Sequence, residues 1–387
     1  MTYMTSLDMN TLLSYSALVG LATLSVYAGS IGSYSAPTEP ECLPTTTTND
    51  ESPIPGPTPL RNGVSLSARH ALVGVAVVVL SVPICLFVGR DPMTKFIQFM
   101  YCIVSITSLC MASASLTRYL LGIERYRRIP RIRLVLNETR LFFDFEYSST
   151  RSDPPTMSTL QGIRLTTIVY SFVSLAASIS YMFGGDSKSI YMSNIVMLSL
   201  AHVDMSLVKP SRFRTVCIFL ALTPIMFGWP AVVLGYGTLA VSETPNVNYP
   251  SRLLVPTVIG SPVTQTTPVI VLSALDIIFP GKLVAFAYRL DTHLQHEGKR
   301  GLVTYFGVTL VAYAVALSIT VGAMHTFGVA QLASFYISPL CFLAFIGTAF
   351  FRGESRYVWG WKEGVQEDAS REEVEKGTGD DKRLGRE

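Results

Sequence analysis

The chain has 387 residues, of which 49% are hydrophobic and 15% are charged, and its formal net charge is +3. Its mean hydropathy of +0.40 leaves too little polar surface to cover the protein in water, so the composition indicates a protein that crosses a membrane several times. The small positive charge is scattered and forms no basic stripe with interleaved aromatic residues, which excludes nucleic acid as the partner.

The chain begins with an apolar run at 11–34 that has Asp8 before it and no basic residues leading into it. This pattern is more typical of a retained membrane anchor, over residues 1–34, than of a cleaved signal peptide. Residues 35–68 are rich in Pro, Thr, Ser and Gly. Such a composition cannot bury a core, so we expect a mobile linker there.

Eight further apolar runs follow, each close to the length that a helix needs to cross the hydrocarbon. They lie at 69–89, 96–117, 161–183, 190–208, 215–241, 266–288, 301–325 and 328–351. The sequence therefore predicts an all-α, polytopic membrane helix bundle of about nine transmembrane helices. In this scheme 69–208 forms an N-terminal bundle of spans two to five, and 209–351 forms a core of spans six to nine.

The basic residues predict the orientation of the bundle. If the N-terminus lies outside, the cytosolic segments are the arginine-rich loop 124–160, the turn 209–214, the loop 289–300 and the tail 352–387. These segments carry most of the Lys and Arg, as cytosolic loops do, so we expect a lumenal N-terminus and a cytosolic C-terminus. The tail alternates acids and bases and is expected to be solvated and disordered.

The run 266–288 carries an acid, Asp276, midway along its length, and no other predicted span holds an acid so deep. A charge at membrane depth is costly and marks a functional site by default. An equal alternative is a protonated Asp that hydrogen-bonds a neighbouring helix. Lys282 lies off the Asp276 face after roughly 600° of helical rotation, and we expect it to extend toward the membrane interface.

Nine spans with an Asp in the seventh resemble the signal peptide peptidase and presenilin family of intramembrane aspartyl proteases. The family motif Gly-x-Gly-Asp, followed by Pro-Gly and Arg-x-Asp, is similar to Ser273-Ala274-Leu275-Asp276, Pro280-Gly281 and Arg289-Leu290-Asp291. Neither glycine of the motif is retained in Ser273-Ala274-Leu275. Residues 210–218 resemble the family's lead into span six, and 324–341 resemble its Gln-Pro-Ala-Leu region in span nine.

The resemblance implies a site that hydrolyses signal peptides and transmembrane helices within the bilayer, without a metal or cofactor. It implies that Asp276 is one catalytic carboxylate. Substrate would be bound by Ala274, Leu275, Leu332, Ala333 and Ser334.

An aspartyl protease needs a second carboxylate, because two acids must share one proton to act as base and acid. The resemblance places it near Met226 or Phe227, yet no acid occurs between Asp204 and Glu243. Asp204 lies at the expected membrane edge, poorly placed to face Asp276. The Pro of the span-nine motif aligns with Leu332, so this motif is altered as well.

We therefore expect a signal-peptide-peptidase-like protein of the endoplasmic reticulum membrane that binds transmembrane helices or signal peptides, with peptidase activity lost or severely reduced. One alternative is an active protease that takes its second carboxylate from Asp204, from a partner subunit, or from a sequence misread around 222–230. Another is a transporter or channel lined by Asp276 and Lys282. A homo-oligomer stays open, and so does an endosomal or vacuolar membrane, because the C-terminus lacks the family's dilysine signal.

Overall fold

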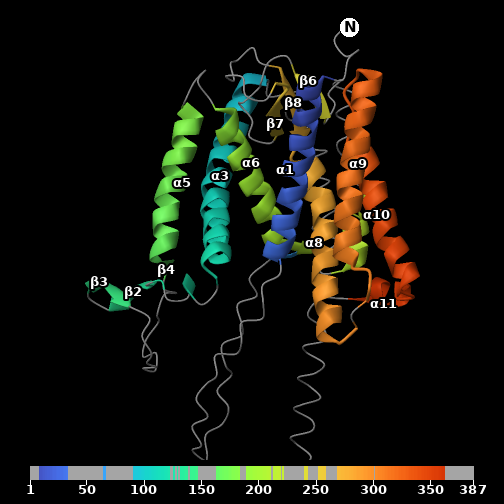
Figure 1. Ribbon diagram of the computed structural model, residues 1–387. Helices are drawn as coiled ribbons and strands as arrows, with labels where there is room; N and C mark the ends of the chain where they lie inside the picture. Colours follow the sequence, from blue (N-terminus) through green and yellow to red (C-terminus); the bar gives the residue numbers. More distant parts are fainter. Residues whose placement is uncertain are drawn as a thin grey trace, which may run out of the picture.

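The computed structural model shows a bundle of long helices that run side by side (Figure 1). It describes residues 8–33, 64–66, 90–122, 125–126, 129, 131–137, 140–146, 163–183, 189–210, 212–218, 220–221, 239–242, 252–258, 268–299 and 301–361. The long helices within these ranges are α1 (Met9–Ser33), α3 (Arg90–Leu121), α5 (Leu165–Phe183), α6 (Ile190–Leu207), α8 (Leu275–His296), α9 (Tyr305–Phe327) and α10 (Ser334–Phe351). A short helix, α11 (Ser355–Gly360), follows α10.

Five helices in the described part of the chain are long and apolar enough to cross a membrane: α1, residues 99–121 of α3, α6, α9 and α10. The polytopic helical fold is therefore confirmed. Helix α8 differs from these five because it buries four charged side chains, those of Asp276, Lys282, Arg289 and Asp291. The expected span 69–89 and most of the expected span 215–241 lie outside the described residues.

Helix α1 contacts α6, α8 and α9 along one face. Its buried face is made largely of small residues, among them Ser14, Ala22, Ser25 and Gly29. Small side chains let helix backbones approach closely, which is how helices associate in a medium as apolar as their own surfaces.

A three-stranded antiparallel sheet lies at the upper end of the bundle in Figure 1. Its central strand is β8 (Val269–Ser273), with β6 (Leu239–Ser242) and β7 (Arg252–Pro256) on either side. The first four residues of β8 are buried, as in strands covered on both faces. The prediction of one helix over 266–288 was wrong, because the β-branched run Val-Ile-Val favours a strand.

Two smaller sheets join other parts of the chain. Strand β1 (Val64–Leu66) pairs in parallel with β5 (Val208–Pro210), which directly follows α6. Strands β2 (Arg131–Asn137) and β3 (Arg140–Glu146) pair as a hairpin, and β4 (Ile163–Arg164) joins β2 on its other side. The segment 124–160, which we expected to be a loop, therefore contains two paired strands.

Helix α8 also extends further than the sequence predicted. It continues to His296, so most of the expected loop 289–300 is helical. The first break after it is Gly298, whose φ of +75° is a left-handed conformation that glycine adopts without steric strain.

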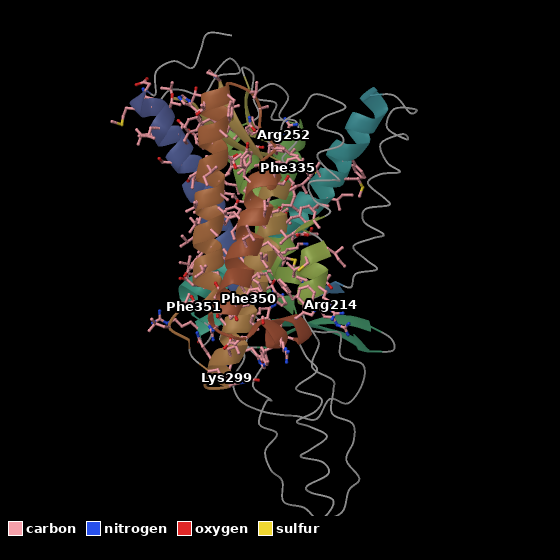
Figure 2. All side chains as sticks on the ribbon, turned by 90° about the vertical axis from the view of Figure 1, so that its right-hand side faces the viewer. Arg214, Arg252, Lys299, Phe335, Phe350 and Phe351 are labelled. Atoms are coloured by element: carbon pink, nitrogen blue, oxygen red, sulfur yellow. The ribbon has the colours of Figure 1, made fainter. Side chains whose placement is uncertain are left out.

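Exposed aromatic and basic side chains gather near the two ends of the bundle. Figure 2 shows Arg252 and Phe335 toward one end, and Arg214, Lys299, Phe350 and Phe351 toward the other. Phe350 and Phe351 are 70% and 79% exposed. Aromatic rings and basic groups at both ends of an apolar bundle are typical of the two membrane interfaces.

Candidate functional site

Asp276 lies in the first turn of α8, directly after the sheet. The chain leaves β8 at Ser273 and turns at Ala274, whose carbonyl accepts hydrogen bonds from the amides of Ile277 and Ile278 at 3.1 and 2.9 Å. Because β8 is paired on both sides, the sheet fixes where α8 starts. Asp276 therefore lies at a strand-to-helix junction. We had expected it midway along a helix.

The junction lies within the bundle. Figure 1 shows that α8 begins below the upper ends of α1 and α9. Five residues of β8 extend for about 16 Å, since a strand rises about 3.3 Å per residue. Asp276 is only 2% exposed, so the carboxylate is buried inside the bundle although it opens its helix.

Helices α9 and α10 approach α8 near Asp276. The hydroxyl of Tyr313, on α9, donates a hydrogen bond to the main-chain carbonyl of Asp276 at 3.5 Å. Tyr313 is fully buried and lies within electrostatic reach of both Asp276 and the Cys341 thiol on α10. The site is thus bounded by three helices that are far apart in the sequence.

One face of α10 brings further polar groups into the core. Ser334, Ser338 and Cys341 follow one another at spacings of four and three residues, which places them on one helix face. The hydroxyls of Ser334 and Ser338 are buried, and neither has a hydrogen-bond partner within the described structure. Each could hydrogen-bond a group brought by a ligand.

The structure places the other predicted site residues as follows. Ala274 is buried at the start of α8, and Leu275 beside it is partly buried. Ala333 and Ser334 are buried at the start of α10, where the carbonyl of Leu332 accepts a hydrogen bond from Phe335. Met226 and Phe227, the expected positions of the second carboxylate, lie outside the described residues.

Asp204 and Lys282 form an ion pair between α6 and α8. The Lys282 ammonium lies 2.8 Å from a carboxylate oxygen of Asp204, and the lysine is 5% exposed. The expectation that Lys282 extends to the interface was wrong. A buried ammonium is strongly unfavourable without a counter-ion, so it is held where Asp204 neutralises it.

The Arg-x-Asp segment joins α8 to neighbouring elements. Arg289 donates to the carbonyl of Pro210 at 3.1 Å. The Asp291 carboxylate accepts hydrogen bonds from the amides of Tyr305 and Phe306, at 3.1 and 2.7 Å, and so caps the N-terminus of α9. Arg352, which follows α10, lies 3.8 Å from Asp291.

Ionisable groups beyond this end of α8 have shifted pKa values. Burial, followed by the nearby Glu297 carboxylate, raises the pKa of Tyr357 to about 12. A hydrogen bond from Lys299 is the main reason that the pKa of Glu297 is lowered. Both groups lie near the chain that follows α8, away from Asp276. Across the part of the chain that the structure describes, no three His, Cys, Asp or Glu side chains are grouped to hold a metal.

These features define a polytopic membrane protein with a polar site buried among its helices. The family model for signal peptide peptidase matches residues 61–364, most of the chain. The protein therefore belongs to the signal peptide peptidase family, whose members are polytopic intramembrane proteases. No solved structure is significantly similar to this chain.

Several curated proteins are similar to parts of the chain. A "Probable intramembrane protease" of Schizosaccharomyces pombe is 25% identical over 215 residues, which cover 54% of this chain and 69% of that protein. Intramembrane protease 2 of Caenorhabditis elegans is 34% identical over 26% of this chain and 24% of its own length. Signal peptide peptidase of Mus musculus is 32% identical over 25% of each chain. The worm and mouse matches thus span only about a quarter of those proteins.

Sequence reasoning did not find every polar group of the site. Ser334 was named from the resemblance, but Ser338 and Cys341 were not. Their spacing from Ser334 could have revealed a polar helix face within an apolar span. Tyr313 carries no comparable signal, because an aromatic residue in an apolar span is most often a packing residue. The partner of Lys282 depends on how α6 packs on α8. The spacing of residues within one span does not predict that packing.

Proposed function

We propose that this protein binds signal peptides or transmembrane helices beside Asp276 and that its peptidase activity is lost or severely reduced. The observation that carries the proposal is the pairing of Asp204 with Lys282. From the sequence, Asp204 was the candidate within this chain for the second carboxylate, which the resemblance places in span six. Its carboxylate pairs instead with the buried ammonium of Lys282 on α8.

The chemistry of peptide hydrolysis explains why this matters. One carboxylate must take a proton from water while a second donates a proton to the carbonyl or the leaving amine. A single Asp276 cannot hold both protonation states at once.

The strand-to-helix junction supports the binding of a helix without its cleavage. A bound helix that unwinds in the bilayer exposes main-chain groups that need new partners. Strand β6 is an outer strand of the sheet and could pair with an extended segment on its free side among the described strands. The outer edge of β7 is already bonded at Leu254 by the side chain of Asn194. The buried hydroxyls of Ser334 and Ser338 offer further hydrogen bonds. In this proposal residues 209–351 form the binding core.

A second candidate function is an active intramembrane protease. It is favoured by the family match and by the retained Asp276, Pro280-Gly281 and Arg289-Leu290-Asp291 segments. For either function we propose the endoplasmic reticulum membrane, with the N-terminus lumenal, and keep an endosomal or vacuolar membrane as the alternative. The support is the family match and the distribution of basic residues.

Photocrosslinking of the purified full-length protein in detergent tests the proposal. A synthetic signal peptide with one photoreactive residue should label α8 or α10 and should be recovered uncleaved. Ser338→Ile should weaken labelling, because it removes a buried hydroxyl and fills its space, whereas Ser318→Ile on the exposed side of α9 should not. Cleavage that disappears in Asp276→Ala would establish the active protease instead. Absence of labelling would exclude binding.

A further inference from the structure

Three contacts tie α8 to α6 and to the chain that follows it. Lys282 pairs with Asp204. Gly281 faces Met205 so closely that an added Cβ would lie 3.5 Å from the methionine Cγ and would collide with its sulfur. Arg289 donates to the carbonyl of Pro210. Lys282 and Arg289 are seven residues apart, about two helical turns, so these contacts lie along one face of α8.

The same stretch leads into the expected sixth span. Phe213, three residues after Pro210, is fully buried. Its ring stacks on Phe345 of α10 with ring centroids 4.8 Å apart, and lies 6.0 Å from that of Phe286 on α8. The chain from 204 to 213 is thus held to α8 at successive points, and residues 213–218 continue from there as helix.

Within the contact between α6 and α8, no other packing interaction can substitute for the ion pair of Asp204 and Lys282. Lys282, Arg289 and Met205 are between 1% and 5% exposed. The Asp204 side chain is 29% exposed, so the lysine is the buried partner. Loss of Asp204 leaves a buried ammonium without compensation, which is strongly destabilising, whereas replacement of both partners by apolar groups is often neutral. The pair is therefore expected to control how α6 seats on α8.

We propose that Asp204 and Lys282 are positioning residues that set the register of α6 on α8, and with it the placement of residues 212–218, which follow α6, beside α8. The functional half of this inference rests on the proposed function. Positions 276 and 282 are about 9 Å apart along the helix axis. Asp204, held at Lys282, acts on the site of Asp276 through helix placement.

Disulfide trapping measures the register directly. In a background without native cysteines, Met205→Cys with Gly281→Cys should crosslink α6 to α8, because the cysteine is shorter than the methionine it replaces. The yield should fall several-fold when Lys282→Met or Asp204→Asn is added alone. It should recover in Asp204→Asn/Lys282→Met and in the exchanged pair Asp204→Lys/Lys282→Asp. Equal yields in all variants, measured below their unfolding temperatures, would overturn the positioning role.

The affinity for the photoreactive signal peptide shows whether Asp204 acts by positioning α6 or by direct contact with the ligand. The single variants should bind the peptide several-fold more weakly than wild type, and the double and exchanged variants should recover. Recovery is not expected if the Asp204 carboxylate itself acts on the ligand, so a double variant as weak as Asp204→Asn would contradict the inference. If the wild type fails to bind, the proposed function fails, and the disulfide yields still decide the register.

Discussion

The carboxylate of Asp291 holds the start of α9 against the end of α8. It accepts two main-chain hydrogen bonds from α9 and lies 3.8 Å from Arg352, whose side chain is 9% exposed. Asp291→Ala should lower the free energy of unfolding by about 3 kcal/mol, because it orphans both amides and leaves the buried guanidinium with less compensation.

Chemical unfolding in detergent measures this loss, and Glu297→Ala is the matched control. Glu297 pairs with Lys299, which is 59% exposed, and such pairs contribute about 0–1 kcal/mol. If the two alanine variants unfold at the same denaturant concentration, the capping role assigned to Asp291 is wrong.

Tyr357 gives a prediction about pH. Its pKa is raised from 10.0 to about 12, first by burial and then by the Glu297 carboxylate. A group whose pKa is higher in the folded state stabilises the fold fully below the unfolded pKa of 10.0, and this contribution is lost as the pH rises through about 12. The ultraviolet titration of wild type minus Tyr357→Phe should have its midpoint near pH 12. A midpoint near pH 10 would show that the ring is not held as described.

At the scale of elements, the contact between α6 and α8 depends on the absence of a side chain at Gly281. A Cβ there would force Met205, which is 1% exposed, out of its position. Gly281→Ala should therefore destabilise the protein by about 1–3 kcal/mol through overpacking.

Gly322→Ala is the control for this prediction, because a Cβ at 322 on α9 meets no atom within 4 Å. It should be neutral or stabilising by up to about 1 kcal/mol, since alanine favours a helix over glycine. Thermal unfolding of the two variants in the same detergent makes the comparison. Equal shifts would mean that the close approach of the helices does not limit stability.

The helices were the most predictable elements, because an apolar run of membrane length has few other folds in a bilayer. Strand β8 was missed since a continuous apolar run fits a buried strand and a helix equally well. Asp276 was found from its depth in the sequence. The pairing of Lys282 with Asp204 was not, because it arises only when α6 and α8 pack together.

At the scale of the whole molecule, the chain has the polytopic helical fold of a family of intramembrane proteases. Helix α8 carries Asp276, Pro280-Gly281 and Arg289-Leu290-Asp291, on which the resemblance to the family rests, and the described residues place Tyr313, Ser334 and Ser338 on the neighbouring helices. If the site is otherwise intact, restoring the missing acid should restore cleavage.

The central claim is tested most directly by the cleavage of a model signal peptide by purified wild type and by Phe227→Asp and Met226→Asp. Thr223→Asp, four residues before position 227, controls for adding an acid to the same expected span. We predict no cleavage by wild type or Thr223→Asp, and cleavage by one of the other two variants that disappears when Asp276→Ala is added. Cleavage by wild type that requires Asp276 would contradict the account.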